Sequence, residues 1–383
     1  MAVMTDLAAP PDLSTLRQRI EAIDAQILEL LAARLAIVDD VVAAKLAAAS
    51  PFRDRAREEL LIGRLRGLAV QLGLDAHEIE RLYRVVLDMS VAHQEAAVRD
   101  RADLPRRVTY QGVEGSYSHL AAQRRYGGRG GGALLTGCGS FRAAAAAVQG
   151  GSADLALLPI ENSTAGSINE TYDLLAHGPL TITGEVVSAV EHCLLALPGA
   201  TLAQLAVVRS HPQALAQCHQ FFVAHPHLRP VIDVDTAGAA RAVRDAGDAS
   251  QAAIASAAAA AAYGLIVVAR AIQDEASNAT RFVEVALRPT PVPPAAVAKT
   301  SLTFVLADRP GALGEILSRI AARGLSLTKL ESRPLRSARW QYRFYLDVLG
   351  HVAGAPLQAV LAELGELTVE LRVLGCYPAA DEP

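Results

Sequence analysis

The hydrophobic residues of the first hundred positions recur with the period of an α-helix. The stripe begins at Leu16, Ile20 and Ile23 and continues to Leu46. A 3.6-residue period over more than thirty residues predicts one long helix. Two shorter helices are predicted over 55–72 and 75–98, because Ser50-Pro51 and Gly73 interrupt the pattern.

A single helix of that length cannot bury its stripe against two shorter helices alone. Partner helices from a second copy of the chain are the natural remedy. We therefore expect an all-helical first domain over 12–100 and a homodimer or higher homo-oligomer.

An alternating α/β pattern follows a charged linker that contains Pro105. Strands and helices that alternate over about 180 residues predict a doubly wound sheet. A domain of this kind can consist of two lobes with a cleft between them. We place this domain at 106–288. The predicted strands are 107–111, 155–158, 181–190, 206–210, 231–234 and 252–256, and the predicted helices are 118–126, 141–149, 212–224, 236–246 and 256–263.

A proline-rich segment between Arg288 and Ala298 predicts a second, stiffer linker. The order after it is strand, helix, strand, strand, helix, strand, which is the ferredoxin-like order. This α+β domain, placed at 299–378, offers no obvious nucleophile or base. It therefore suggests sensing rather than chemistry.

Composition excludes several classes of function. The chain has 383 residues, a mean hydropathy of +0.24 and no apolar run long enough to span a membrane. Its start lacks a signal sequence, and its four cysteines are far apart, which fits a cytoplasmic protein with reduced thiols. A net charge of −4 gives no support to nucleic-acid binding, and no metal or cofactor is predicted.

Polar side chains crowd the run that follows the apolar strand at 155–158. We expect Pro159 to end that strand, and Glu161, Asn162, Ser163 and Thr164 then supply donors and acceptors. The carboxyl end of a strand is where open α/β sheets bind ligands. The alternative is a polar strand-to-helix connection with Ser163 or Thr164 as the helix cap.

Basic residues on the long helix suggest an anion site. Arg34 and Lys45 are eleven residues apart, so they share one face at about 16 Å along the axis, and both can bend toward one small dianion. Arg17 lies about 25 Å from Arg34 and can reach that ligand only from an antiparallel partner. The alternative is a set of solvated helix faces.

The helical segment resembles the all-helical class of chorismate mutase, a domain-swapped dimer. The motifs are LRQRIEAID, the Arg34 to Lys45 spacing, RDRARE and SVAHQ. The resemblance implies that Arg17 of the other chain, Arg34 and Arg57 hold the carboxylates of chorismate. It further implies that Lys45 and Gln94 donate to the ether oxygen, that Glu58 holds the ring hydroxyl, and that Asp54 and Ser90 support this set.

The α/β segment resembles prephenate dehydratase from Val108 to Val285. The motifs are the polar run at 161–169, Gly112-Val113-Glu114-Gly115-Ser116-Tyr117-Ser118, Ser210-His211-Pro212-Gln213 and Asn278-Ala279-Thr280-Arg281-Phe282. The resemblance implies Thr280 as general-acid candidate, with site partners Asn162, Ser210 and Gln217 and further prephenate contacts from Ser163, Thr164, Arg281 and Phe282.

Three roles within that site stay open. Thr280 can be a hydrogen-bond donor and positioner or a true proton source. Arg281 can bind a carboxylate or serve structure. His211 fits a turn residue better than a base, because decarboxylation coupled to water loss requires no proton abstraction from carbon.

The last domain resembles the ACT regulatory domain of the same dehydratases. Two motifs carry the likeness: Asp308-Arg309-Pro310-Gly311-Ala312-Leu313 and Glu331-Ser332-Arg333-Pro334. In that family they border a phenylalanine site between two paired domains, which implies feedback by L-phenylalanine. A helix N-terminus opened by Gly311 also lets backbone donors approach an anion.

The three resemblances occur in the order of the bifunctional chorismate mutase/prephenate dehydratase family. This predicts rearrangement of chorismate to prephenate and conversion of prephenate to phenylpyruvate. Two alternatives are a dehydratase whose helical domain only dimerises and a non-catalytic, two-lobed amino-acid-sensing protein. The sequence leaves open whether arogenate is also accepted and whether prephenate passes directly between sites.

Overall fold

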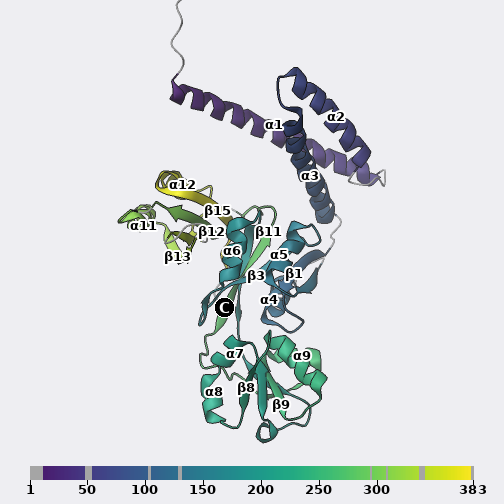
Figure 1. Cartoon of the computed structure of the whole chain (residues 1–383), viewed down its shortest axis with the longest axis vertical. Helices are drawn as coiled ribbons and strands as arrows, with labels where there is room; N and C mark the ends of the chain where they lie inside the picture. Colours follow the sequence, from purple (N-terminus) through teal and green to yellow (C-terminus); the bar gives the residue numbers. More distant parts are fainter. Residues whose placement is uncertain are drawn as a thin grey trace, which may run out of the picture. The chain divides into compact units, whose positions relative to one another are not determined.

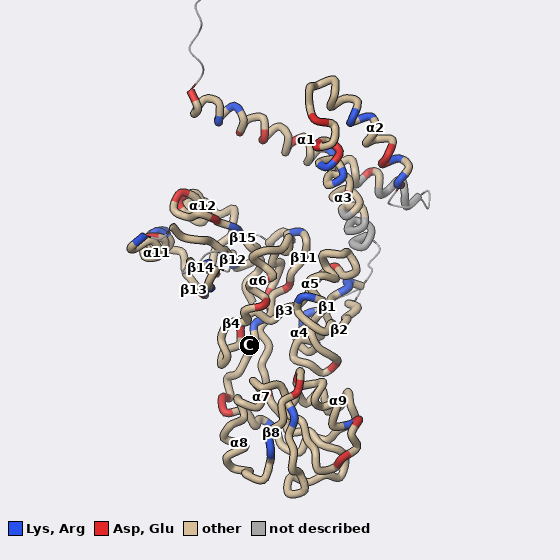
Figure 2. The backbone as a smooth tube through the Cα atoms, viewed as in Figure 1, with Lys and Arg blue, Asp and Glu red and all other residues tan. Residues whose placement is uncertain are grey.

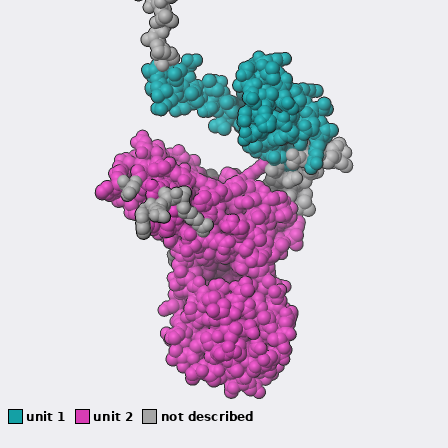
Figure 3. Space-filling view, viewed as in Figure 1, with its two compact units in different colours: residues 1–104 teal, residues 105–383 magenta. Residues whose placement is uncertain are grey.

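The computed structural model describes residues 12–47, 54–101, 105–127, 132–293, 296–307, 309–335 and 341–380. The chain divides into two compact units, Met1–Leu104 and Pro105–Pro383 (Figures 1 and 3). Within the described residues, no helix is long and apolar enough to cross a membrane.

Unit 1 contains the predicted long helix and the two shorter ones. They are α1 (Leu13–Ala47), α2 (Arg55–Gln71) and α3 (Ala76–Arg101). The Asp54 carboxylate caps α2 by accepting the Arg57 backbone N–H at 3.0 Å. Gly73 turns the chain toward α3 with a φ of +75°, which glycine adopts readily.

The apolar stripe of α1 is largely exposed within one copy of the chain. Helix α1 contacts α3 near Val38, which is buried. Ile20, Ile23 and Ile27 are each at least half exposed, and Figure 2 shows acidic and basic residues interspersed along the same helix. A contiguous exposed apolar surface of this kind is typical of an interaction face.

Unit 2 begins with a lobe built on a mixed sheet of strand order β2-β1-β3-β11-β5, in which the short β4 pairs with β3. Strand β1 is parallel to β2 and β3, and β11 is antiparallel to β3 and β5. The elements are β1 (Arg106–Gln111), α4 (Tyr117–Tyr126), β2 (Ala133–Cys138), α5 (Phe141–Gln149), β3 (Leu155–Asn162), β4 (Gly166–Ser167), α6 (Asn169–His177), β5 (Thr181–Ala189) and β11 (Ala279–Ala286).

The second lobe is inserted between β5 and β11, so the chain crosses between the lobes twice. Its sheet has the order β10-β6-β9-β7-β8. The elements are β6 (Cys193–Ala196), η1 (Leu202–Gln204), β7 (Val207–Ser210), α7 (Pro212–Ala216), α8 (His219–Ala224), β8 (Arg229–Ile232), α9 (Thr236–Ala246), β9 (Gln251–Ala255), α10 (Ala257–Tyr263) and β10 (Ile266–Ala269). This confirms the predicted two-lobed α/β arrangement.

The remaining part of unit 2 has the predicted ferredoxin-like order. Its antiparallel sheet runs β13-β14-β12-β15, and α11 and α12 cover one face. The elements are β12 (Ala298–Leu306), α11 (Ala312–Ala322), β13 (Ser326–Pro334), β14 (Tyr342–Leu349), α12 (Ala355–Leu367) and β15 (Thr368–Pro378).

Several local predictions were wrong. Pro159 does not end its strand, because β3 continues to Asn162 through an irregular register with β11, and a bulge tolerates a residue that lacks an N–H. Ser163 and Thr164 do not cap a helix, since α6 begins at Asn169. The predicted helix 212–224 divides into α7 and α8, and strands β2, β4, β6, β10 and β11 were not anticipated.

The ferredoxin-like sheet shares a hydrophobic core with the first lobe. Tyr345, Leu374 and Tyr377 belong to the same buried cluster as Tyr172 and Ile182. Strands β15 and β5 come close together in this contact and leave no room for a side chain at Gly375. A Cβ atom at that position would overlap the Ile182 carbonyl oxygen.

Gly375→Ala should therefore destabilise unit 2. The added methyl group meets backbone atoms, so β15 and β5 must separate, at a cost of about 3 kcal/mol. Urea unfolding followed by circular dichroism measures the effect. Gly365→Ala on α12 is the matched control, because its Cβ meets nothing within 4 Å, and there alanine should be neutral or slightly stabilising. Equal midpoints for the two variants would contradict the tight contact.

Candidate active sites

A cleft of about 380 Å³ lies in unit 2 and is lined by residues from both lobes (Figure 3). From the first lobe, Asn162, Thr280 and Phe282 reach it from the adjacent strands β3 and β11. From the second lobe, Gln217 and His211 reach it from the segment that contains α7. The cleft thus brings together polar residues that are over a hundred positions apart in sequence.

Thr280 and Asn162 are direct partners across β11 and β3. The Asn162 Nδ2 group donates a hydrogen bond to the Thr280 Oγ1 atom at 3.0 Å, and both side chains are buried. The structure therefore brings together two residues that the sequence predicted as site partners.

The orientation of the Asn162 amide is set by its neighbours. Its Oδ1 atom accepts the Ala165 backbone N–H at 2.9 Å and the Thr164 hydroxyl at 2.8 Å, so the amino group must face Thr280. The Thr280 oxygen is then an acceptor, and its own hydrogen is available to a ligand in the cleft. Accepting a hydrogen bond also polarises the hydroxyl toward donation.

Gln217 joins the two lobes at this site. Its amino group donates to Asn162 Oδ1 at 3.3 Å and also to Thr164, while its Oε1 atom accepts from Asn278 at 3.1 Å. The same Oε1 atom lies 2.9 Å from His192 Nε2, so this ring nitrogen carries the proton and donates. These contacts hold the second-lobe segment against the strands that carry Asn162 and Thr280.

His192 was missed by the sequence analysis. It lies in the crossing after β5, and its Nδ1 atom is 2.8 Å from the Tyr117 hydroxyl. Burial lowers its pKa below the usual 6.5, with the hydrogen bond to Gln217 as the smaller opposing effect. Nothing around a lone histidine in the sequence indicates this position.

Unit 2 should lose stability as the pH falls below about 6.5. Above that pH His192 is neutral in both states. Below it the unfolded chain binds a proton that the buried ring resists, because burial lowers the folded-state pKa. Urea unfolding at pH 7.5 and 5.5 measures the loss. His192→Gln should show a smaller loss over the same interval, and an identical loss would contradict the assignment.

Not every predicted site residue points into the cleft. The Ser210 hydroxyl is fully buried and donates to the Ile254 carbonyl at 2.6 Å. Ser163 accepts the Ala279 backbone N–H at 2.9 Å and thus ties the start of β11 to the polar run. His211 does line the cleft, but its side chain accepts the Gln213 N–H at the start of α7, which agrees with a turn residue.

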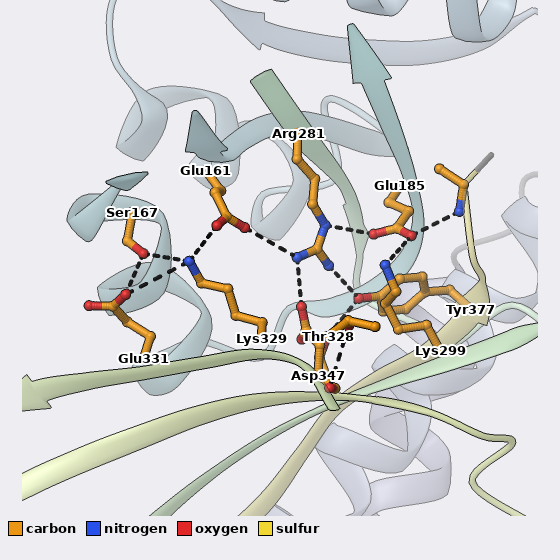
Figure 4. Close-up of polar contacts among 12 residues, drawn as sticks. Glu161, Ser167, Glu185, Arg281, Lys299, Thr328, Lys329, Glu331, Asp347 and Tyr377 are labelled. Carbon is orange, nitrogen blue, oxygen red and sulfur yellow. Dashed lines mark hydrogen bonds and ion pairs between the residues drawn. The ribbon is translucent and has the colours of Figure 1, made fainter. Parts of the chain in front are cut away.

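Arg281 also points away from the cleft, on the opposite side of β11 from Thr280 and Phe282. Its guanidinium bonds to Glu185, Asp347 and Tyr377 and is not part of the cleft lining (Figure 4). Burial disfavours its charge, but the nearby carboxylates outweigh this and raise its pKa. The structure therefore favours the structural reading of Arg281 over carboxylate binding.

Three helix N-termini border the cleft, and the charged side chains that line it, Glu170 and Asp235, are both acidic. Ser116, Ser140 and Asp235 cap α4, α5 and α9, and each of these caps lines the cleft. Backbone N–H groups at such ends favour carboxylates and phosphates. No Lys or Arg occurs among the described residues that line the cleft. An anionic ligand there would be held by helix ends and hydroxyl groups.

The helical unit brings part of its predicted site together. Arg34 donates to the Ser90 hydroxyl across α1 and α3, and Ser90 and Gln94 are buried. Arg17 and Arg57 are exposed, and Glu58 is partly buried near the start of α2. Lys45 lies in the last turns of α1, and its side chain falls outside the described residues. Arg34 and Ser90 are thus in contact, and Gln94 lies four residues after Ser90 on the same helix.

The ferredoxin-like domain places its two motifs differently. Gly311, Ala312 and Leu313 line a pocket of about 270 Å³ at the start of α11, together with Tyr342 and Phe344. The second motif, Glu331, Ser332, Arg333 and Pro334, lies on β13. Glu331 accepts from Ser167 of the first lobe, and Arg333 pairs with Asp173 at 3.3 Å. Asp308 lies outside the described residues.

These features define a class of protein: a multidomain enzyme with a helical domain, a two-lobed α/β domain whose cleft is polar, and a small α+β domain. Three family models match in that order: chorismate mutase type II over 16–95, prephenate dehydratase over 108–290 and the ACT domain over 300–366. The chain is 38% identical over 372 residues to the bifunctional chorismate mutase/prephenate dehydratase of Escherichia coli (strain K12), covering 96% of each chain. It therefore belongs to the family of bifunctional chorismate mutase/prephenate dehydratases, as the sequence predicted.

Solved structures resemble most of the chain. The prephenate dehydratase of Arthrobacter aurescens in complex with L-Phe matches with a TM-score of 0.66 and 33% identity, over 72% of this chain and 91% of that one. GqqA, described as a novel type of quorum-quenching acylase, matches with a TM-score of 0.64 and 39% identity, over 72% of this chain and 98% of that one. The predicted fold class and its enzymatic nature are thus confirmed.

Proposed function

We propose that unit 1 rearranges chorismate to prephenate and that the cleft of unit 2 converts prephenate to phenylpyruvate. The observation that carries the second assignment is the Asn162–Thr280 pair, which presents a polarised hydroxyl to a cleft bordered by helix N-termini. The order of the three matching family models supports the combination in one chain.

The mutase step needs no nucleophile, since the rearrangement is pericyclic. The site has to hold chorismate in a compact conformer and stabilise the ether oxygen as its bond breaks. We assign the carboxylates to Arg34, Arg57 and the Arg17 of a second copy. Lys45 and Gln94 then donate to the ether oxygen, while Glu58 holds the ring hydroxyl and Asp54 and Ser90 support the set.

Two copies of the chain complete this site in our proposal. The exposed apolar stripe of α1 would pack against its equivalent in a homodimer, and the same pairing would bring Arg17 to the partner's Arg34. The proposed domain limits remain 12–100, 106–288 and 299–378, and the cytoplasmic location remains a prediction.

The dehydratase step breaks two bonds together. The carbon–carbon bond to the ring carboxylate breaks and releases CO₂, its electron pair makes the ring aromatic, and the ring hydroxyl leaves as hydroxide, which a proton converts to water. Thr280 would donate a hydrogen bond to that departing oxygen, with Asn162 polarising it. Gln217, Ser163 and Thr164 hold Asn162 and the start of β11 in place, and Phe282 offers an apolar wall to the forming aromatic ring.

We place L-phenylalanine regulation in the ACT domain. Gly311, Ala312 and Leu313 line one side of the proposed site, and the segment from Glu331 to Pro334 belongs to the strand that a second domain could extend. Inhibition then requires two conformations with unequal affinity for phenylalanine.

Incubation of the purified chain with chorismate tests the whole proposal. Phenylpyruvate as product supports it. Prephenate alone would remove the dehydratase, and consumption of added prephenate without any use of chorismate would reduce the helical domain to dimerisation. No turnover of either compound would support a non-catalytic amino-acid sensor. Arogenate in place of prephenate tests the breadth of the cleft in the same assay.

A further inference from the structure

Asn162 and Thr280 each have a charged neighbour in the sequence whose side chain points to the other side of the sheet. Arg281 follows Thr280 on β11, and Glu161 precedes Asn162 on β3, where the two charged residues are also direct partners. Successive side chains of a strand alternate between its faces. The cleft residues and the charged residues therefore share the backbone of the same two strands, so a shift of one pair also shifts the other.

Arg281 is held jointly by the ACT domain and by its own lobe, where Glu161 Oε2 also lies 3.8 Å from its Nη1 atom. Its Nη1 atom lies 2.6 Å from Asp347 Oδ2 on β14, and its Nη2 atom lies 3.0 Å from the Tyr377 hydroxyl on β15. Its Nε atom lies 2.6 Å from Glu185 Oε2 on β5 of the first lobe. The three nitrogens of one planar group are thus directed to three strands, a geometry that lysine cannot reproduce.

A second bridge runs parallel to the first. Lys329 on β13 lies 2.8 Å from Glu161 Oε1 and donates to the Ser167 hydroxyl, also at 2.8 Å (Figure 4). Ser167 in turn donates to Glu331. Strands β3 and β11 are therefore both bonded to the ACT sheet, at the positions adjacent in sequence to Asn162 and Thr280.

The contacts around Arg281 are largely shielded from solvent. The side chains of Arg281 and Asp347 are 12% and 9% exposed, and Glu185 is 1% exposed. The Ser301 hydroxyl donates a hydrogen bond to the other Asp347 carboxylate oxygen, Oδ1, at 2.5 Å. Charges buried with this many partners have defined positions, and loss of one partner leaves the others poorly compensated.

We propose that the ACT sheet is a positioning element of the dehydratase site, with Arg281 as the positioning residue that sets the place of Thr280 through Asp347 and Tyr377. The ACT domain would then support turnover itself, in addition to any effector binding. This inference rests on the proposed role of Thr280 in the dehydratase step.

Asp347→Asn and Tyr377→Phe test the inference on the full chain. Both keep the size of the side chain, and both weaken the hold of the ACT sheet on Arg281. We expect the dehydratase kcat on prephenate to fall about tenfold for Asp347→Asn, since a misplacement of about 1 Å can cost about 10²-fold and the shift expected here is smaller. The KM should stay within about twofold, because neither residue lines the cleft, and the mutase rate on chorismate should not change. Tyr377→Phe should show the same pattern with a smaller fall.

Glu370→Gln is the matched control. It breaks the ion pair between β15 and Arg343 of β14, 2.6 Å long, which does not involve Arg281. Its dehydratase kcat should equal that of the parent protein. An unchanged kcat in Asp347→Asn would overturn the inference, and so would a fall matched by the control. A fall in kcat that only follows a lowered unfolding midpoint would show a purely stabilising role and would also overturn it.

Thr280→Ala distinguishes a failure of this inference from a failure of the proposed dehydratase role of Thr280. If that variant keeps full dehydratase activity, the proposed role of Thr280 fails whatever Asp347→Asn does. If it loses activity while Asp347→Asn keeps its kcat, only the positioning role of the ACT sheet fails. Arg281→Lys adds a third comparison, in which the charge is retained, the planar fork is lost, and kcat should fall as in Asp347→Asn.

Discussion

Thr280→Ala should lower the dehydratase kcat by about 10² to 10³, the usual loss when one donor to a developing negative charge is removed. The hydroxyl accepts from Asn162 and so directs its own hydrogen into the cleft. Alanine leaves the strand and the hydrophobic contacts intact but gives the departing hydroxide no partner. Steady-state assays of phenylpyruvate formation from prephenate measure the effect.

Two controls make this result specific. Thr280→Ser keeps the hydroxyl and should restore much of the rate. Thr136→Ala removes an exposed threonine from β2 of the same lobe and should leave the rate unchanged. Chorismate consumption by Thr280→Ala should stay at the parent level, with prephenate accumulating. A rate within twofold of the parent protein would show that the hydroxyl is dispensable.

Lys45→Ala should lower the mutase kcat by about 10² to 10³, because a charged donor to the ether oxygen is worth most when that oxygen gains charge. The folded state should lose little, since Lys45 lies near the C-terminal end of α1. Chorismate disappearance measures the rate, and urea unfolding measures stability. The dehydratase activity on added prephenate should be unaffected.

Arg19→Ala is the matched control, because it removes an exposed basic residue from the same helix. It should not alter the mutase rate. Lys45→Arg keeps the charge in a wider, planar group and should recover only part of the activity. If Lys45→Ala lowered stability and turnover in parallel, a structural role would replace the catalytic one.

Long and periodic features were predictable because they depend on local physics. The 3.6-residue period alone predicts α1, and the strand and helix order of the ACT domain follows from turn residues and alternating apolar runs. Strands β2, β4, β6, β10 and β11 were not predicted, because their stability comes from neighbours in the sheet. Pro159 was misread for the same reason, since only the pairing with β11 reveals the bulge that accommodates it.

The candidate cleft was predictable in its residue types and less so in its contacts. Asn162 and Thr280 stand in motifs rich in short polar groups, and the structure brings them together with Gln217, which only the family resemblance indicated. Ser210 has the same chemical character, yet its hydroxyl is directed to a buried carbonyl. His192 has no local signal, and its place depends on a crossing between lobes.

The sequence by itself determined the three domains, their order, the family and the residues available for chemistry, because periodicity, turn residues and motifs are properties of short segments. Only the tertiary structure decided where those side chains point. Arg281 and Thr280 are neighbours in sequence, but strand alternation sends one toward the ACT sheet and the other into the cleft. One face of β11 meets the cleft and the other meets the ACT sheet because of how strands far apart in the chain pack together. That packing gives these two adjacent residues their different surroundings.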